Sequence, residues 1–600
     1  MFSINKSKWL LLLWLILNAA ALADQLPKNN LTLIHQIQGD SVISPLLGSI
    51  VTVEAIVVGD FQGRSALTGF FVQEQDTEVD KLSATSEGLF VYDPNGRTDV
   101  HLGDLVRVTG LVKEYYGLTE LTQVNVTVVS GNHPLPSAAN LSLPLASRDA
   151  LEPYEGMRVS LPQPLTVTDN YQLGRYGEVW LSFGGRLMAP TQVAFPGEDA
   201  KAVSAANALN RILINDGRLV QNPEPIIHPA PQLTASNSLR CGDRVTGVTG
   251  VLSYAYGHYR VEPTSTLPAT HQRTGLPSEV GGRLKVAAFN VLNYFNGNGM
   301  GGGFPTSRGA DSLVEFQRQR EKLIFALTAM AADIIGLVEL ENDGYSGTSA
   351  IQDLVNGLNA AAPSGIHYAF INPGVFRMGT DAITVGLIYR VETVMPVQPA
   401  AVLDSSVDSR YHHKNRPTLA QTFQERATGS RLTVAVTHLK SKGSNCNRLG
   451  DPNVGDGQGN CNLTRTRAAQ ALVDWLATEA NVLIIGDLNA YANEDPITVL
   501  KKGGYIDLID ELLEDSRSYS YIYQGQAGYL DYALASSSLW SQVTGVTVWA
   551  INADEPRVLD YNMEYQSAGQ QGQLYHVDPY RSSDHDPVIV GLSLNAIVSD

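Results

Sequence analysis

Several expected strands in the C-terminal half of this 600-residue sequence end beside a polar side chain that could bind a metal ion or a phosphate group. Apolar, β-branched runs such as "VAAF", "IIGLV", "LTVAVT" and "VLIIG" are typical of buried strands. A single polar residue at such a place is usually a cap or a turn residue. Their number in one region indicates a shared site, because ligands bind at the strand ends of α/β sheets. The residues are Asn290, Glu339, His438, Asp487, Asn489, Asp531, Asp584 and His585.

Their chemical types predict hydrolysis of a phosphoester by water with the help of a metal ion. Carboxylate and amide oxygens, as in Glu339, Asp487 and Asn489, are hard ligands that suit Mg²⁺ (or Mn²⁺). The His and Cys clusters of a zinc site are missing from the sequence. A histidine activates water when a carboxylate orients its other ring nitrogen, and Asp531 is the candidate to orient His585. No nucleophilic Ser or Cys motif is present, so we expect water to attack.

The elements that carry these residues alternate between strands and helices from residue 283 onward, which is typical of an α/β domain. An amphipathic helix is expected over 312–332 and a second helix over 465–480. The apolar face of the first helix would contain Leu313, Phe316, Leu323, Leu327 and Met330.

The part of the chain before residue 283 reads as β structure. Short alternating apolar runs separated by Gly and Asp indicate a small barrel or sandwich over 31–130. Segments 154–182 and 241–263 resemble 46–63 and 102–121, which predicts a second, related β module over 150–270. We therefore expect a multidomain chain with two all-β modules before the α/β domain, and we expect the modules to add affinity for a polymer, not chemistry.

Composition and the N-terminus indicate an exported globular protein. With 44% hydrophobic and 17% charged residues the chain is not disordered. Residues 1–23 combine two lysines, an apolar stretch too short to prefer a membrane span, and a small-residue cleavage site, which predicts a signal peptide. The net charge of −18 argues mildly against a polyanion partner. It does not exclude a nuclease, because metal-binding carboxylates contribute to that charge.

The three cysteines divide into a close pair and one distant residue. Cys446 and Cys461 bracket a short loop, and in an oxidising compartment this spacing favours a disulfide. Cys241 is expected to be a buried core residue. The bracketed loop is rich in Gly and has the oxygen-bearing residues Asp451, Asn453 and Asp456. It is either a Ca²⁺ loop that lacks the distal Glu of an EF-hand or a turn held by the disulfide.

Six motifs in order carry a resemblance to a known family. They are "FNVLNYF", "GLVELEN", "VTHLKSKG", "IGDLNAY", "YLDYALAS" and "SSDHDPV". Over 283–594 the chain resembles the endonuclease/exonuclease/phosphatase superfamily, whose members include deoxyribonuclease I. This resemblance implies a two-sheet α/β sandwich and metal-dependent phosphodiester hydrolysis. The whole chain is most similar to secreted bacterial extracellular nucleases of the ExeM/NucH type, which implies that the module over 31–130 is OB-fold-like.

The resemblance also implies a role for each motif residue. Glu339 would be the main metal ligand, with Asn290 beside it and Asp584 joining. Asp487 and Asn489 would position the attacking water and the scissile phosphate.

The remaining roles concern the base and the phosphate. His585, oriented by Asp531, would be the base or would stabilise the transition state. His438 would contact the phosphate from the other side or protonate the leaving oxygen, with Asp381 as its partner. Arg416 and Lys440, together with Asn489, would bind the phosphate.

Three functions remain open from the sequence. The first is a secreted metal-dependent nuclease acting on DNA, with RNA as a further substrate. The second is a phosphatase or a sphingomyelinase-type phosphodiesterase on the same fold, because fold does not settle substrate. The third is a non-catalytic matrix-binding protein, which the intact motifs disfavour. We expect a monomer without stable membrane association, released from the cell because the sequence lacks a C-terminal sorting tail.

Overall fold

The computed structural model describes residues 31–267, 269–270, 273–513 and 517–595, so the predicted signal peptide at 1–23 lies outside the described residues. Internal contacts divide the chain into two compact units. The first unit contains the chain up to Asn140 together with Asp149–Ser160 and Thr249–Thr264. The second contains Leu141–Arg148, Leu161–Val248 and the chain from Ser265 onward. Each unit is described by itself below.

A closed β-barrel forms most of the first unit. Its strands pair in the order β1-β2-β3-β5-β4. In the first eight residues of β4 every second residue is buried, which is the period of a strand with one face toward a core. The strands are β1 (Ile50–Phe61), β2 (Gly69–Gln73), β3 (Gly88–Tyr92), β4 (Leu105–Tyr115) and β5 (Leu118–Ser130). The unit also contains helix α2 (Ile34–Gln38) and strands β6 (Ala139–Asn140) and β14 (His258–Pro263), together with all but one terminal residue of the short helix η2 (Arg148–Tyr154) and of strands β7 (Arg158–Leu161) and β13 (Val248–Ala255).

Residues 161–248, which we call the middle segment, are part of the second unit and are β-rich but not all-β. Helix α5 (Glu198–Leu209) was not expected, although its Ala-rich sequence and its acidic first turn favour a helix. The sheet here has the order β15-β12-β8-β9-β11. The elements are β8 (Leu165–Asp169), α3 (Leu173–Tyr176), β9 (Val179–Phe183), β10 (Leu187–Met188), α4 (Pro190–Val193), β11 (Arg211–Ile214), β12 (Arg244–Val245) and β15 (Ala269–Thr270).

Two large sheets form the main body of the rest of the second unit. The first has the order β18-β19-β17-β16-β30-β29. Its strands are β18 (Tyr368–Phe370), β19 (Ile383–Arg390), β17 (Ile334–Glu341), β16 (Leu284–Tyr294), β30 (Val588–Leu592) and β29 (Val543–Val548). The second has the order β20-β22-β23-β24-β28-β25, with β21 beside β22. Its strands are β20 (Val394–Pro396), β21 (Ala401–Leu403), β22 (Thr418–Glu425), β23 (Arg431–His438), β24 (Val482–Asp487), β28 (Asp531–Ser536) and β25 (Tyr505–Asp507).

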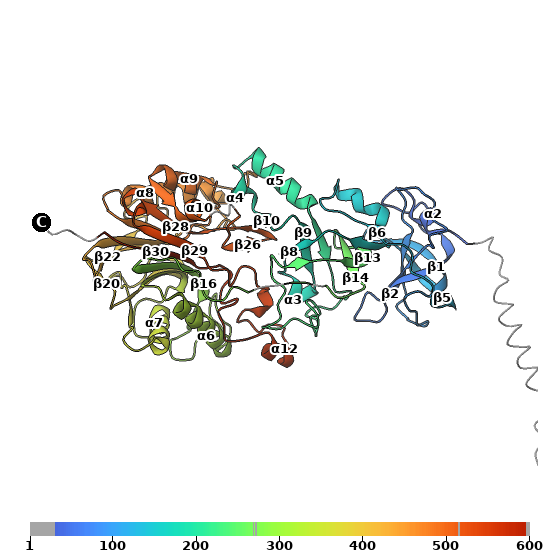
Figure 1. Ribbon diagram of the computed structural model, residues 1–600, viewed down its shortest axis with the longest axis horizontal. Helices are drawn as coiled ribbons and strands as arrows, with labels where there is room; N and C mark the ends of the chain where they lie inside the picture. Colours follow the sequence, from blue (N-terminus) through green and yellow to red (C-terminus); the bar gives the residue numbers. More distant parts are fainter. Residues whose placement is uncertain (1–30, 268, 271–272, 514–516, 596–600) are drawn as a thin grey trace, which may run out of the picture. The chain divides into compact units, whose positions relative to one another are not determined.

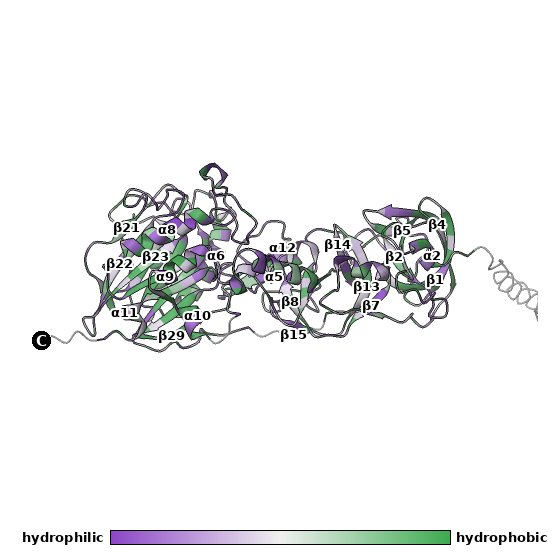
Figure 2. Cartoon of the chain, turned by 90° about the horizontal axis from the view of Figure 1, so that it is seen from above, coloured by the Kyte–Doolittle hydropathy of each residue, from purple (hydrophilic) through white to green (hydrophobic). Residues whose placement is uncertain are grey.

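The two sheets pack face to face, and helices cover both outer faces (Figure 1). Helices α6 (Leu313–Met330) and α7 (Ala350–Ala361) lie on the first sheet, and α8 (Asn462–Trp475), α9 (Asp495–Lys502) and α10 (Leu508–Leu512) lie on the second. In Figure 2 the strands of this domain are mostly green, since most of their residues are apolar. The predicted two-sheet α/β sandwich is confirmed. The remaining elements are η3 (Asn447–Leu449), β26 (Tyr521–Tyr523), β27 (Gln526–Gly528), α11 (Ser537–Trp540), η4 (Arg557–Leu559) and α12 (Ala568–Gln573).

Helix α6 begins at the predicted place, where Ser312 caps it by accepting a hydrogen bond from the N–H of Glu315. Of its predicted apolar face, Phe316, Leu323 and Met330 are buried, whereas Leu313 in the first turn is exposed. Among the described helices, none is both long and apolar enough to cross a membrane.

Candidate active site

Three strands of the second sheet bring His438, Asp487 and Asp531 into one row. The register pairs His438 with Asp487, and Asp487 with Asp531. Because β23 and β24 are parallel and β28 is antiparallel to β24, two strand ends meet one strand start at the same edge. Gly486 permits this close approach: its φ is +123°, and a Cβ there would lie 2.2 Å from the carbonyl oxygen of Thr437.

The three predicted metal ligands are Asn290, Glu339 and Asp584. The first two lie in strands of the first sheet, and Asp584 lies in the loop before β30. A register shift after Asn290 in β16 and another around Glu339 in β17 interrupt the ladder. The carboxylate of Glu339 accepts a hydrogen bond from the N–H of Asn293 at 3.1 Å. Ser583 Oγ donates to the carbonyl oxygen of Asn290 at 2.6 Å, which brings the loop containing Asp584 to the end of β16.

His585 and Asp531 connect the two sheets. The distance from His585 Nδ1 to Asp531 Oδ2 is 2.7 Å, and both residues are buried. The same carboxylate oxygen accepts a hydrogen bond from Ser520 Oγ at 2.6 Å. The ring of Tyr521 stacks on the imidazole with 4.5 Å between centroids. With Nδ1 engaged, Nε2 has no hydrogen-bond partner among the described residues and remains for water or substrate.

Burial and neighbouring charges shift the pKa values of these groups. Burial opposes the charged imidazole, but the carboxylates of Asp531, Asp584 and Asp487 hold the pKa of His585 well above its usual value. Burial, reinforced by Asp584, raises the pKa of Glu339. Burial also raises the pKa of Asp487. The charge of Asp531 adds to this shift, and that of His585 opposes it.

His438 is a neutral histidine in this arrangement. Burial lowers its pKa well below the usual value, and the nearby charges of Arg416, His585 and Lys440 act in the same direction. Its Nε2 lies 3.4 Å from Asp487 Oδ2, and its buried Nδ1 has no hydrogen-bond partner among the described residues.

The predicted pairing of Asp381 with His438 is wrong. Asp381 Oδ2 accepts a hydrogen bond from Arg416 Nε at 3.0 Å, and Oδ1 lies 3.3 Å from Arg308 Nη1. The buried guanidinium of Arg416 requires a counter-charge, and Asp381 supplies it. Although burial opposes the carboxylate, Arg416 holds the pKa of Asp381 below its usual value. Lys440 is half-buried nearby, where burial and Arg416 lower its pKa.

Asn489 follows Asp487 in a tight turn with φ +48°. Its N–H donates to Asp487 Oδ1 at 2.8 Å, and its Nδ2 donates to the carbonyl oxygen of Leu439 at 3.1 Å. Asn489 therefore links the end of β24 to the residue that follows His438.

Of the two interpretations of the Gly-rich loop, the contacts favour the turn held by the disulfide. Asp451 accepts hydrogen bonds from the N–H groups of Leu463 and Thr464, and it therefore caps the start of α8. The side chains of Asn453 and Asp456 accept N–H groups within their own turns, from Gly455 and Gln458. Sequence spacing suggested a common ion, but each oxygen stabilises its local backbone instead. No group of three or more His, Cys, Asp or Glu side chains in the described ranges is arranged to hold a metal ion.

The predicted disulfide between Cys446 and Cys461 is confirmed, with 5.3 Å between Cα atoms, and Cys241 is free and buried. The bridge closes the loop 446–461. Arg465, four residues after this loop, connects it to the segment after β23, because its buried Nη1 donates to the carbonyl oxygens of Lys440 and Asn460.

We expect the double Cys446→Ser, Cys461→Ser variant to lose more activity than thermal stability. By chain entropy such a short loop is worth about 3 kcal/mol at most, while its disorder would free the segment after His438. Turnover and melting temperature, measured on the oxidised protein and the variant, check this. The prediction would be contradicted if turnover and melting temperature fell in equal proportion. It would also be contradicted if the melting temperature fell steeply while the protein that remains folded kept full turnover.

Sequence reasoning missed two residues that hold the "SSDHDP" loop. Asn552 is fully buried; its Oδ1 accepts the N–H groups of Ser582 and Ser583, and its Nδ2 donates to the carbonyl oxygen of His585. Asp586 Oδ1 accepts three consecutive N–H groups, those of residues 551–553. Ser520 and Tyr521 were missed as well; they lie nine and eight residues before "YLDYALAS", and only the fold brings them to Asp531 and His585.

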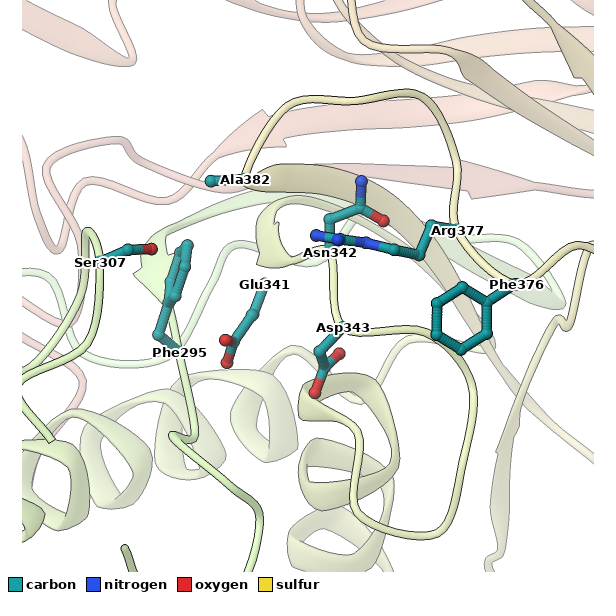
Figure 3. Close-up of a pocket in the computed structure, with 8 residues that line it drawn as sticks. All are labelled: Phe295, Ser307, Glu341, Asn342, Asp343, Phe376, Arg377 and Ala382. Carbon is teal, nitrogen blue, oxygen red and sulfur yellow. The ribbon is translucent and has the colours of Figure 1, made fainter. Parts of the chain in front are cut away.

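A cavity of about 250 Å³ lies at the end of β17, where Glu341, Asn342 and Asp343 line it (Figure 3). Its lining includes Glu341, two positions after Glu339, and Ala382, next to Asp381. Figure 3 shows the carboxylates of Glu341 and Asp343 pointing the same way. Burial raises the pKa of Glu341 to about 7, and Asp343 adds to the shift.

The donor set at the first sheet fits a divalent cation. Glu339 Oε1 and the carboxylate of Asp584 accept no hydrogen bond from the described residues, although both are partly buried. Asn290 Oδ1 accepts one hydrogen bond, from the N–H of Leu292, and so keeps a second lone pair. Two carboxylates and an amide oxygen are ligands that Mg²⁺ or Mn²⁺ prefers.

Comparisons with known proteins agree with this geometry. Residues 289–585 match the model of the Endonuclease/Exonuclease/phosphatase family, and this range contains every strand-end residue described above. Residues 140–272 match a domain of unknown function (DUF8508). No curated protein sequence matches the chain.

Several solved structures are similar at low sequence identity. The endonuclease/exonuclease/phosphatase from Bacteroides vulgatus is 15% identical, with a TM-score of 0.33, covering 52% of this chain and 99% of that one. For the mannosyl-6-phosphatase of Bacteroides thetaiotaomicron the values are 14%, 0.32, 52% and 100%. For D. rerio TDP2 in complex with a single-strand DNA product they are 13%, 0.31, 51% and 97%. The family match and the strand-end geometry show that the C-terminal domain belongs to the endonuclease/exonuclease/phosphatase family and that the protein is a hydrolase of phosphoric esters.

Proposed function

We propose that the protein is an exported, divalent-metal-dependent nuclease that hydrolyses phosphodiester bonds of DNA. The observation that carries this proposal is the hydrogen bond between His585 and Asp531. This hydrogen bond joins the two sheets. The carboxylates of Glu339 and Asp584 belong to the first sheet and its loop, and the row of His438 and Asp487 belongs to the second sheet. A charged histidine, a neutral histidine and free carboxylates around one point suit attack of water on a phosphodiester.

Each side chain has a role that follows from its contacts. Asp531 holds His585 Nδ1, so Nε2 is directed to the reacting group and can exchange a proton there. Asp487 and Asn489, fixed to each other, orient the water. Arg416 and Lys440 supply positive charge for the phosphate.

A metal ion would bind to Glu339, Asp584 and Asn290. A divalent cation in that place supplies Lewis-acid stabilisation of the charge that develops on the phosphate.

The barrel of the first unit supports a polymeric substrate. Its strand order, β1-β2-β3-β5-β4 in a closed barrel, is that expected of an OB-like fold, which binds single strands by stacking and charge. Tyr115 and Tyr116 are exposed at the turn between β4 and β5, with ring centroids 4.8 Å apart, and Lys113 Nζ lies 4.9 Å from the ring of Tyr115. Exposed aromatic rings beside a lysine are suited to stacking on bases.

Export is supported by the disulfide, because such bridges persist in oxidising compartments. We propose that residues 1–23 are removed and that the mature protein is released from the cell. Mass spectrometry of protein from the culture medium would find a mature chain that begins at Asp24. Retention of residues 1–23 on a cell-associated protein would contradict this.

The purified chain, incubated with supercoiled plasmid, single-stranded DNA or RNA, is expected to cleave DNA with Mg²⁺ or Mn²⁺ and to lose all activity in EDTA. p-Nitrophenyl phosphate and sphingomyelin vesicles are the substrates that test the two alternative functions, phosphatase and lipid phosphodiesterase. Hydrolysis of the monoester or of sphingomyelin without DNA cleavage would replace the nuclease with a phosphatase or a lipid phosphodiesterase.

A further inference from the structure

The middle segment, residues 161–248, contacts all three chain segments that flank the catalytic side chains. The first segment follows Asn489, the second precedes Asp531, and the third supports His585. The contacts belong to the same compact unit as the active site.

The first contact lies just after Asn489. Thr191 Oγ1 in helix α4 donates to the carboxylate of Glu494 at 2.6 Å, and Asn493 Nδ2 donates to the carbonyl oxygen of Gln192 at 2.9 Å. Ala189 packs with Tyr491 and Leu530 in a small apolar cluster. The turn after Asn489 is therefore held by α4 and by Ala189, the residue before α4.

The second contact is a strand pairing that precedes Asp531. Strand β10 pairs in parallel with β27, and β27 pairs with β26. Ser520 and Tyr521, which contact Asp531 and His585, lie at the start of this small sheet. Thr168 Oγ1 also donates to the carbonyl oxygen of Gly525 at 2.6 Å, in the turn between β26 and β27.

The third contact is centred on Asp554, a buried carboxylate two residues after Asn552. Arg186 binds it with two hydrogen bonds, of 2.6 and 2.9 Å, and Arg240 Nη2 lies 3.4 Å from it. Tyr519 donates its hydroxyl to the same carboxylate at 2.8 Å. Since Asn552 binds the residues 582–585 and Tyr519 precedes Ser520, this one cluster fixes the supports of both members of the His585–Asp531 pair.

Resting on the proposed function, we propose that the middle segment is a positioning element of the active site and that Arg186 is its principal positioning residue. A bidentate guanidinium–carboxylate pair fixes orientation as well as distance, which a lysine in the same place does not. This differs from the expectation that the β region contributes only affinity for a polymer.

The test is a set of folded variants of the full chain, assayed with bis(p-nitrophenyl) phosphate, which is too small to engage the barrel. We expect Arg186→Ala to lower kcat by about 10²-fold with KM little changed, because a displacement of about 1 Å at a catalytic group has this effect. Arg186→Lys should be intermediate. The matched control is Arg218→Ala. Arg218 belongs to the same segment, but its polar partners among the described residues are Asp216 and the carbonyl oxygen of Pro225.

A double-mutant cycle separates positioning from a general loss of stability. If Arg186 acts through the segment containing Ser520, then Arg186→Ala should lower kcat much less in a Ser520→Ala background than in the wild type. Hydrogen exchange should rise in residues 517–531 of Arg186→Ala and not of Arg218→Ala.

Wild-type kcat in both Arg186 variants, or full additivity in the cycle, would overturn the proposal. Should Arg186→Ala fail to fold, Arg186→Lys decides, because wild-type turnover in that variant would remove the need for the bidentate pair. Should the wild-type chain hydrolyse no phosphodiester, the proposed function fails, while hydrogen exchange still shows whether Arg186 orders residues 517–531.

Discussion

Replacement of His585 with asparagine or alanine is expected to reduce phosphodiester cleavage by at least about 10³-fold, because in the proposed mechanism this side chain exchanges protons with the reacting group. Asparagine retains an N–H group that can donate to Asp531, so the buried carboxylate keeps a partner and the fold should be preserved. Alanine leaves Asp531 with Ser520 alone and should also lower the melting temperature. Turnover and thermal melting of both variants check this.

The matched control is His367→Ala. His367 also pairs with a carboxylate, at 2.8 Å from Glu392, but its side chain is 65% exposed on another part of the domain. Its removal should leave turnover unchanged. Near-normal turnover in folded His585→Asn would disprove the catalytic role.

Replacement of Glu339 with glutamine is expected to weaken the metal site and leave the fold intact. The amide oxygen of glutamine can still accept the N–H of Asn293, but the ligand loses its charge. We expect the metal concentration that gives half-maximal activity to rise by at least about tenfold, so that high Mg²⁺ or Mn²⁺ restores part of the activity. His585→Asn should show no such rescue, because it retains every metal ligand.

Glu341→Gln is the control for this prediction. Glu341 lies two residues along the same strand, and its carboxylate likewise accepts a backbone N–H, that of Asn296 at 3.0 Å. Its metal titration should match that of the wild type. If Glu339→Gln and Glu341→Gln shift the titration equally, or if Glu339→Gln and His585→Asn respond alike, the assignment of Glu339 as a ligand is wrong.

The sequence predicted the sandwich and the strand-end residues because both follow from local patterns. The buried runs of β23, β24 and β28 are recognisable from their composition, and sheet geometry then places His438, Asp487 and Asp531 at one edge. Ionic partners were less predictable. Asp381 was assigned to His438 because the family resemblance implies a supporting residue for that histidine and Asp381 is the acid available in that stretch. In the structure Asp381 pairs with the buried guanidinium of Arg416 instead, and burial of that kind is visible only in the folded chain.

Contacts between distant segments could not be predicted at all. Strand β10 has two residues and no recognisable pattern, and its partner β27 lies more than 300 residues away in the chain. Asn552 and Asp586 bind backbone groups, so no spacing of side-chain types announces them. The two interpretations of the Gly-rich loop could not be separated from the sequence for a related reason, because Asp451 caps a helix whose start was expected three residues later.

The backbone of Glu339 has a consequence for how this protein would respond to selection. Its φ of +67° lies in the left-handed region, which costs a residue other than glycine about 1 kcal/mol. A glycine at this position would relax the backbone and remove a half-buried carboxylate. A laboratory screen that rewarded heat resistance or soluble yield without asking for turnover would therefore favour loss of the carboxylate that we propose as a metal ligand. At Glu339 the proposed metal-binding role and the greatest stability therefore favour different residues, and variants that lack the carboxylate would be the more stable ones.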